Sequence, residues 1–149
     1  MRRTLAMAAL TIGLLGICAP AMAVSWGPTS SYYGGTKRVT GWGDFYNSGN
    51  TYARSKMVTR DDSNDGNTVY GRTVFNYYGL RCTPTCETRW FVSTTKSTPE
   101  FSNSTRTYWL DRGLYGLGDR ARGKVFACAQ MGWPVPDSCS PASYPTFNY

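Results

Sequence analysis

The sequence contains no histidine, the residue that most often serves as general base and metal ligand near neutral pH. Its absence excludes Ser-His-Asp and Cys-His catalysis as well as any histidine-ligated zinc site. Acidic residues are also scarce, with nine against sixteen basic ones. They lie mostly in turn segments without a recognisable pairing, so a hydrolase that works with two carboxylates is only an alternative. We therefore favour a non-enzymatic protein and expect neither a cofactor nor a metal site.

Long apolar runs are missing from the chain after its first segment. Arg2 and Arg3 precede an apolar run at residues 5–17, and an Ala-Met-Ala cleavage site follows it. This order is typical of a secretory signal peptide, and the run is shorter than the about 20 residues that a membrane span needs. We therefore predict an exported protein with a signal peptide at residues 1–23, no transmembrane segment and a single β domain at residues 24–149.

Helix-forming patterns are scarce as well. No long stretch places apolar residues at three-and-four spacing, and the only helical candidate is one short turn at residues 111–117. Segments of β type alternate instead with turn clusters, and the cluster at residues 61–67 carries an Asp-Gly step that is typical of a hairpin. We predict an all-β domain, an antiparallel sandwich or barrel of about six to eight strands, with a Pro-rich tail at residues 131–149 that wraps the surface. After an extended lead-in at 24–36, the expected strands are 37–46, 51–60, 68–78, 87–95, 103–110 and 120–130.

Four cysteines follow the signal segment, namely Cys82, Cys86, Cys128 and Cys139. An even number of cysteines in an exported chain indicates two disulfides. Cys82 and Cys86 surround a proline turn, whereas Cys128 and Cys139 flank a second Pro-rich loop. Among the three possible pairings we therefore favour 82–86 with 128–139. The alternative of a four-cysteine zinc site requires reduced thiolates, which export disfavours.

One acidic segment imitates the first half of a calcium-binding loop. Asp61, Ser63 and Asp65 precede Gly66 with the spacing of such a loop. The twelfth position is Arg72, where a bidentate glutamate is required. We therefore predict a hairpin tip at this position and no metal ion.

Basic side chains give the main indication of function. Alternation within residues 51–60 places basic and aromatic side chains on one strand face, and residues 120–130 repeat the pattern with alanine and valine on the opposite, core side. If the two strands are near neighbours, six basic side chains form one patch. The alternative is an ordinary solvated sheet face whose charges prevent edge pairing. The candidate binding residues are Tyr52, Arg54, Lys56, Arg60, Arg120, Arg122, Lys124 and Phe126.

The aromatic residues suggest sugar binding as a second possible function, because flat rings can stack on sugars. The same rings are also common in protein cores. We expect Trp90 and Trp109, which lie in the middle of strands, in the core. Tyr32, Tyr33 and Trp42 lie among glycines, and we expect them at the surface. The candidates for stacking are Trp26, Trp42, Tyr32, Tyr33 and Tyr46.

These observations together favour an exported, non-enzymatic protein that binds an extracellular anionic or glycan surface through basic and aromatic side chains. We expect a cell-wall polymer, a polysaccharide or an unknown protein as its partner, and we do not favour nucleic acid. In its signal segment and its Tyr-, Gly-, Ser- and Thr-rich strands, the chain resembles small secreted proteins of Gram-positive bacteria. In its basic and aromatic character, it is similar to small secreted β-sandwich bacteriocins. That resemblance implies a bacterial source and an antibacterial effector as an alternative function. An inhibitor of a secreted hydrolase, presenting the loop between Cys82 and Cys86, is a further alternative.

Overall fold

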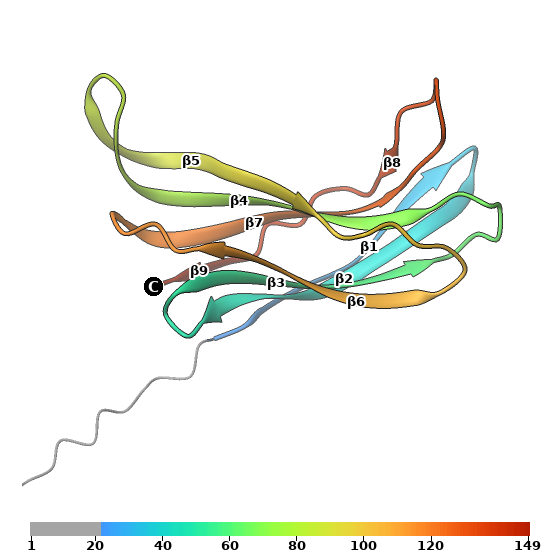
Figure 1. Cartoon of the computed structure of the whole chain (residues 1–149), viewed down its shortest axis with the longest axis horizontal. Helices are drawn as coiled ribbons and strands as arrows, with labels where there is room; N and C mark the ends of the chain where they lie inside the picture. Colours follow the sequence, from blue (N-terminus) through green and yellow to red (C-terminus); the bar gives the residue numbers. More distant parts are fainter. Residues whose placement is uncertain (1–21) are drawn as a thin grey trace, which may run out of the picture.

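The structure, a computed structural model, describes residues 22–149, so nearly all of the predicted signal peptide lies outside the described residues. The described chain forms nine strands and no helix, arranged in two antiparallel sheets that face each other (Figure 1). Sheet A has the strand order β1-β2-β3-β6. Sheet B has the order β5-β4-β7, and β8 and β9 both pair with β7. The strands are β1 (Val24–Tyr33), β2 (Thr36–Ser48), β3 (Tyr52–Asp61), β4 (Val69–Cys82), β5 (Cys86–Ser97), β6 (Thr105–Gly113), β7 (Gly118–Ala129), β8 (Ser138–Cys139) and β9 (Thr146–Asn148).

The prediction of an antiparallel all-β fold is confirmed. The six expected strands correspond to β2 through β7, and the extended lead-in forms β1 as a partner of β2. The one helical candidate, at residues 111–117, does not form a helix. Strand β6 continues to Gly113, which lies opposite Tyr52 of β3, and the Gly118 amide then donates to the Tyr115 carbonyl at 2.9 Å. Pairing with β3 satisfies the backbone groups that a helix would otherwise have bonded within itself.

The predicted hairpin at residues 61–67 is also wrong, although the turn itself is present. Strand β3 belongs to sheet A and β4 to sheet B, so this segment crosses from one sheet to the other. Asp61 accepts a hydrogen bond from the Ser63 amide at 3.1 Å, and Asp65 accepts one from the Asn67 amide at 3.0 Å. The side chains of Asp61 and Asp65 therefore stabilise the backbone of the turn. Within residues 22–149, no group of three or more histidine, cysteine or acidic side chains is placed to hold a metal ion.

The core lies between the sheets and follows the alternation of the strands. Val125, Ala127 and Ala129 of β7 point inward, as the sequence predicts. Phe75 of the neighbouring β4 and Phe45 of the facing sheet A fill the space beside them, with ring centroids 6.0 Å apart. Burying one such phenylalanine stabilises the fold by about 1.5–3 kcal/mol. The small side chains of β7 let the two sheets approach closely.

Two disulfides fasten the ends of sheet B, and the favoured pairing is confirmed. Cys82 bonds to Cys86 across the β4–β5 hairpin, and Cys128 of β7 bonds to Cys139 of β8. The four-cysteine zinc site is therefore wrong, because all four sulfur atoms are used. The Pro-rich tail adds only β8 and β9, both short and both paired to β7. In Figure 1 the β4–β5 hairpin and the β7–β8 loop rise at opposite ends, on the side of sheet B that faces away from sheet A.

Candidate binding faces

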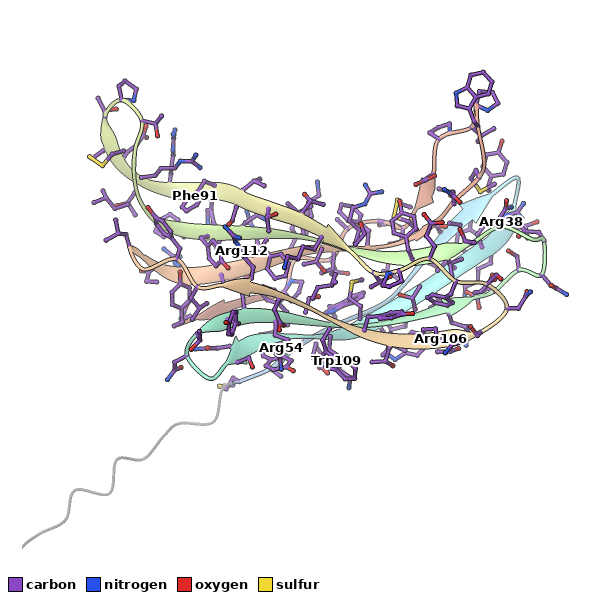
Figure 2. All side chains as sticks on the ribbon, viewed as in Figure 1. Arg38, Arg54, Phe91, Arg106, Trp109 and Arg112 are labelled. Carbon is purple, nitrogen blue, oxygen red and sulfur yellow. A yellow bond between two sulfur atoms is a disulfide. The ribbon has the colours of Figure 1, made fainter. Side chains whose placement is uncertain are left out.

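The structure separates the two sets of predicted binding residues. Tyr52, Arg54, Lys56 and Arg60 belong to β3 of sheet A, whereas the set from Arg120 to Phe126 belongs to β7 of sheet B. Figure 2 shows Arg54 on the side of sheet A that faces away from sheet B. In β7 the inward positions are taken by alanine and valine, so its basic side chains point away from sheet A. The single patch of six basic residues is therefore wrong, because the two strands lie in different layers.

On sheet A, ion pairs compensate the basic side chains. Arg54 donates two hydrogen bonds of 2.7 Å to the carboxylate of Asp111, and these bonds raise the pKa of the Arg54 guanidinium above its ordinary value. Lys56 lies 3.7 Å from Asp44, and Arg60 donates to Asp62 at 2.8 Å. The three predicted cations of this face therefore each have an acidic partner. At these three positions the charges are paired and contribute little net field.

On sheet B, register brings the β7 side chains next to those of β4. Arg120 lies opposite Tyr78, Arg122 opposite Asn76, and Phe126 opposite Arg72. Strand β5 extends the same row, because Trp90 lies opposite Tyr78. We call this surface the cationic face; it comprises Arg72, Tyr78, Trp90, Arg120, Arg122, Lys124, Phe126 and Tyr144.

Aromatic rings hold the cations of this face in place. The Arg122 guanidinium carbon lies 4.3 Å from the centre of the Trp90 ring and 5.8 Å from that of Tyr144. The Arg120 guanidinium lies 4.0 Å from the Tyr78 ring, and the Lys124 amine lies 5.3 Å from the Phe126 ring. All four distances are within the range of cation–π attraction. Stacked cations of this kind lose less conformational freedom when they bind a ligand.

The charges on the cationic face are only partly balanced. Arg120 pairs with the neighbouring Asp119 at 3.3 Å. Arg72 donates to the hydroxyl of Tyr70, which donates to Asp137 at 2.6 Å; burial first, and then the bond to Asp137, raise the pKa of Tyr70.

Two cations at the centre of this face remain uncompensated. Among residues 22–149, neither Arg122 nor Lys124 forms an ion pair with an acidic side chain. The Nε of Arg122 is buried and has no hydrogen-bond partner in the described chain. The centre of the cationic face is therefore the place where positive charge is most available to a ligand.

Several members of the cationic face were missed in the sequence. Arg72 and Tyr78 lie in the expected strand 68–78, at positions that alternation places on one side. The two-residue alternation of side chains along this strand could therefore have identified Arg72 and Tyr78 as members of the face. Trp90 and Tyr144 join the face through β5 and the tail, and no local pattern indicates this.

The predictions for individual aromatic residues had mixed outcomes. Tyr32 and Tyr33 are exposed, as expected. Trp26 is only 5% exposed and belongs to the core. Trp109 is 56% exposed, so its predicted place in the core is wrong (Figure 2). Trp90 is also not a core residue, since it lies on the cationic face.

No protein-family model matches the chain, and neither a curated protein nor a solved structure matches it. Residues 22–149 contain no helix with the length and apolar character required to cross a membrane.

Proposed function

We propose that this chain is an exported, non-enzymatic protein that binds an extracellular anionic polymer through the cationic face of sheet B. The observation that carries the proposal is the pair Arg122 and Lys124, which have no acidic partner in the described part of the chain and lie against aromatic rings. A guanidinium group binds carboxylate and phosphate oxygens through two parallel hydrogen bonds. The rings beside it offer apolar surface to the backbone or sugar rings of the same polymer.

The shape around the cationic face supports a flexible chain as the partner. The β4–β5 hairpin and the β7–β8 loop rise at the two ends of sheet B (Figure 1). The β7–β8 loop carries Trp133, which is 97% exposed. A flat, rigid surface would meet these two projections before it reached Arg122. A polymer strand can bend between them and reach the centre, so wall polymers and acidic polysaccharides fit better than a membrane plane.

The proposal is tested by retention of the oxidised protein on insoluble cell wall and on insoluble polysaccharides at low and high salt. Surface attraction acts over about 10 Å at 0.1 M salt and over about 3 Å at 1 M. We expect strong retention on wall polymer at 0.05 M salt and loss of most of it at 0.5 M. Retention that is equal at both concentrations would contradict the electrostatic mechanism. The absence of retention on every polymer would move the search to protein partners.

A further inference from the structure

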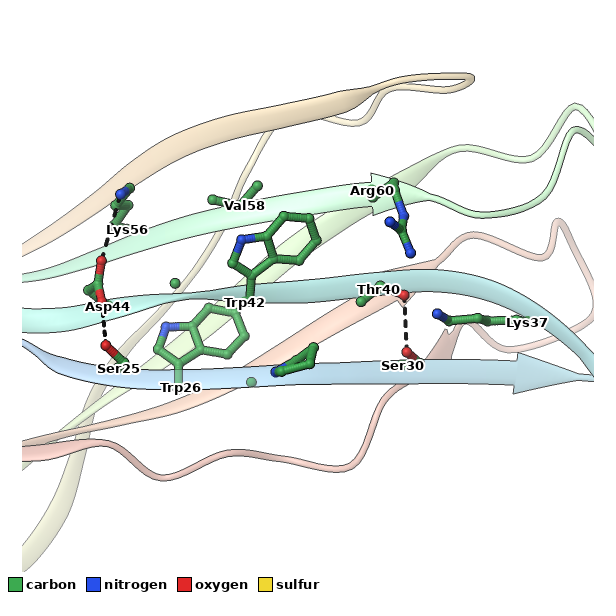
Figure 3. Close-up of a pocket in the computed structure, with 13 residues that line it drawn as sticks. Ser25, Trp26, Ser30, Lys37, Thr40, Trp42, Asp44, Lys56, Val58 and Arg60 are labelled. Carbon is green, nitrogen blue, oxygen red and sulfur yellow. Dashed lines mark hydrogen bonds and ion pairs between the residues drawn. The ribbon is translucent and has the colours of Figure 1, made fainter.

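A recessed surface lies on the outer face of sheet A, on the side of the molecule opposite the cationic face. It is a groove of about 690 Å³ along β2, between β1 and β3 (Figure 3). Trp42, which is half-buried, lies in the groove beside Val58 of β3, and the core residue Trp26 of β1 lies beneath it. Pro28 completes the wall on the β1 side. We call this surface the Trp42 groove. Its volume lies within the range of small-molecule sites.

The two ends of the Trp42 groove differ in charge. At one end Asp44 accepts a hydrogen bond from the Ser25 hydroxyl at 2.8 Å and lies 3.7 Å from the Lys56 amine, so this end is neutral. At the other end two cations share a single carboxylate. Arg60 donates to one oxygen of Asp62 at 2.8 Å, and the Lys37 amine lies 3.6 Å from the other oxygen. This end therefore carries one surplus positive charge.

The carboxylate of Asp62 already has three side-chain partners. Besides the two cations it accepts a hydrogen bond from the hydroxyl of Thr40. Both cations retain unused N–H donors, because Arg60 is engaged through Nε alone and Lys37 through one contact. These donors belong to residues that line the groove. The position is thus suited to a second anion, supplied by a ligand.

We propose that the Trp42 groove binds an acidic sugar residue, a pyranose ring that carries one carboxylate. The apolar face of the sugar ring lies against the Trp42 indole, and its carboxylate meets the donors of Lys37 and Arg60. The hydroxyls of an adjoining sugar unit reach the groups at the neutral end, where Asp44 accepts and Lys56 donates. A groove with one aromatic platform, polar groups at both ends and one excess positive charge matches this chemistry. The site lies on the other sheet from the cationic face and does not depend on the proposed function.

The experiment compares a galacturonic acid trimer with the matching neutral galactose trimer, each titrated into the oxidised protein by calorimetry. The titrations use the Arg122→Gln/Lys124→Gln variant as background, so that the cationic face does not contribute. We expect the acidic trimer to bind at least tenfold more tightly than the neutral one. We expect Trp42→Ala to weaken both trimers at least tenfold and Arg60→Gln to abolish the preference for the acid.

Two matched controls come from the same sheet. Trp109→Ala removes an exposed tryptophan that does not line the groove, and Arg106→Gln removes an exposed arginine of β6. We expect neither control to change the affinity by more than twofold. A one-dimensional NMR spectrum with native dispersion shows that each variant is folded. The indole N–H of Trp26 gives a local readout, because it lies beneath the groove with no hydrogen-bond partner in residues 22–149, and we expect its resonance to shift on binding.

Three results would overturn the proposal. The first is equal affinity for the acidic and neutral trimers. The second is a loss of binding in Trp109→Ala as large as that in Trp42→Ala. The third is binding that disappears in the Arg122→Gln/Lys124→Gln background but is present in the wild-type protein, which would place the sugar on the cationic face. That last result would support the proposed function while refuting the groove, so failures of the two proposals are distinguishable.

Discussion

Replacing the two uncompensated cations of the cationic face, Arg122→Gln and Lys124→Gln, is the sharpest test of the proposed function. Each side chain is half-buried, and each lies against an aromatic ring. A hydrogen bond between charged groups contributes about 1.5–3 kcal/mol when it is protected from water, and an exposed ion pair contributes about 1 kcal/mol or less. For two half-exposed cations we take about 1 kcal/mol each. The expected total of about 2 kcal/mol corresponds to a roughly thirtyfold weaker affinity, since 1.4 kcal/mol is a factor of ten.

The assay is equilibrium binding of each variant to soluble wall polymer at 0.05 M salt. The matched control is the pair Arg54→Gln and Arg106→Gln, which removes the same formal charge from sheet A. Because Arg54 is already paired with Asp111, we expect the control to lower stability more than binding. The salt dependence of binding should become shallower in the Arg122/Lys124 variant and stay unchanged in the control.

Equal loss of affinity in the two double variants would refute the reasoning. It would show that the polymer responds to the net charge of the molecule and not to the local arrangement on sheet B. An unchanged affinity in the Arg122/Lys124 variant would refute it as well, because the aromatic rings alone would then account for binding.

Three further predictions concern stability and can be checked by chemical unfolding. Gly43→Ala should cost about 2–3 kcal/mol, because its Cβ would lie 1.9 Å from a β3 carbonyl oxygen, whereas Gly113→Ala, with open space around it, should change stability by less than about 0.5 kcal/mol. Replacing Cys128 and Cys139 by serine should cost about 3 kcal/mol in the chain-entropy description, given their separation of 11 residues. Burial raises the pKa of the Tyr77 hydroxyl. The stabilisation that this neutral, buried hydroxyl gives the folded state is therefore complete below the ordinary tyrosine pKa of about 10 and is lost at higher pH. The free energy of unfolding should therefore fall between pH 9 and pH 11, and less steeply in the Tyr77→Phe variant.

The sequence predicted those features that depend on near neighbours along the chain. Alternating side chains located β2 through β7, and the alanines and valine of β7 identified its core side. Both disulfides join cysteines on either side of a short Pro-containing loop, so their pairing followed from spacing. Each of these features depends on residues of the same strand or on residues separated by 11 positions or fewer.

Adjacent aromatic residues could not be assigned to faces in the same way. Trp90 is followed by Phe91, and Trp109 by Leu110; in a strand such neighbours point to opposite sides. The smaller member of each pair faces the interior: Phe91 packs against Tyr77, and Leu110 is buried. Their size and hydrophobicity predicted the two tryptophans in the core. In the structure Phe91 and Leu110 occupy the space between the sheets instead.

Local sequence accounts for the strands, the core side of β7 and the disulfides, whereas the division of the strands between two layers arises from tertiary packing. The Asp-Gly segment at residues 61–67 satisfies its backbone through Asx turns, and such turns serve a hairpin and a crossover between sheets equally well. That crossover places β3 in sheet A and β4 in sheet B, and the chain crosses between the sheets twice more, from β5 to β6 and from β6 to β7. These crossovers separate the basic residues of β3, which find acidic partners, from Arg122 and Lys124 of β7, which find none within residues 22–149. Sheet membership depends on long-range packing of whole faces, and no local pattern of residues encodes it.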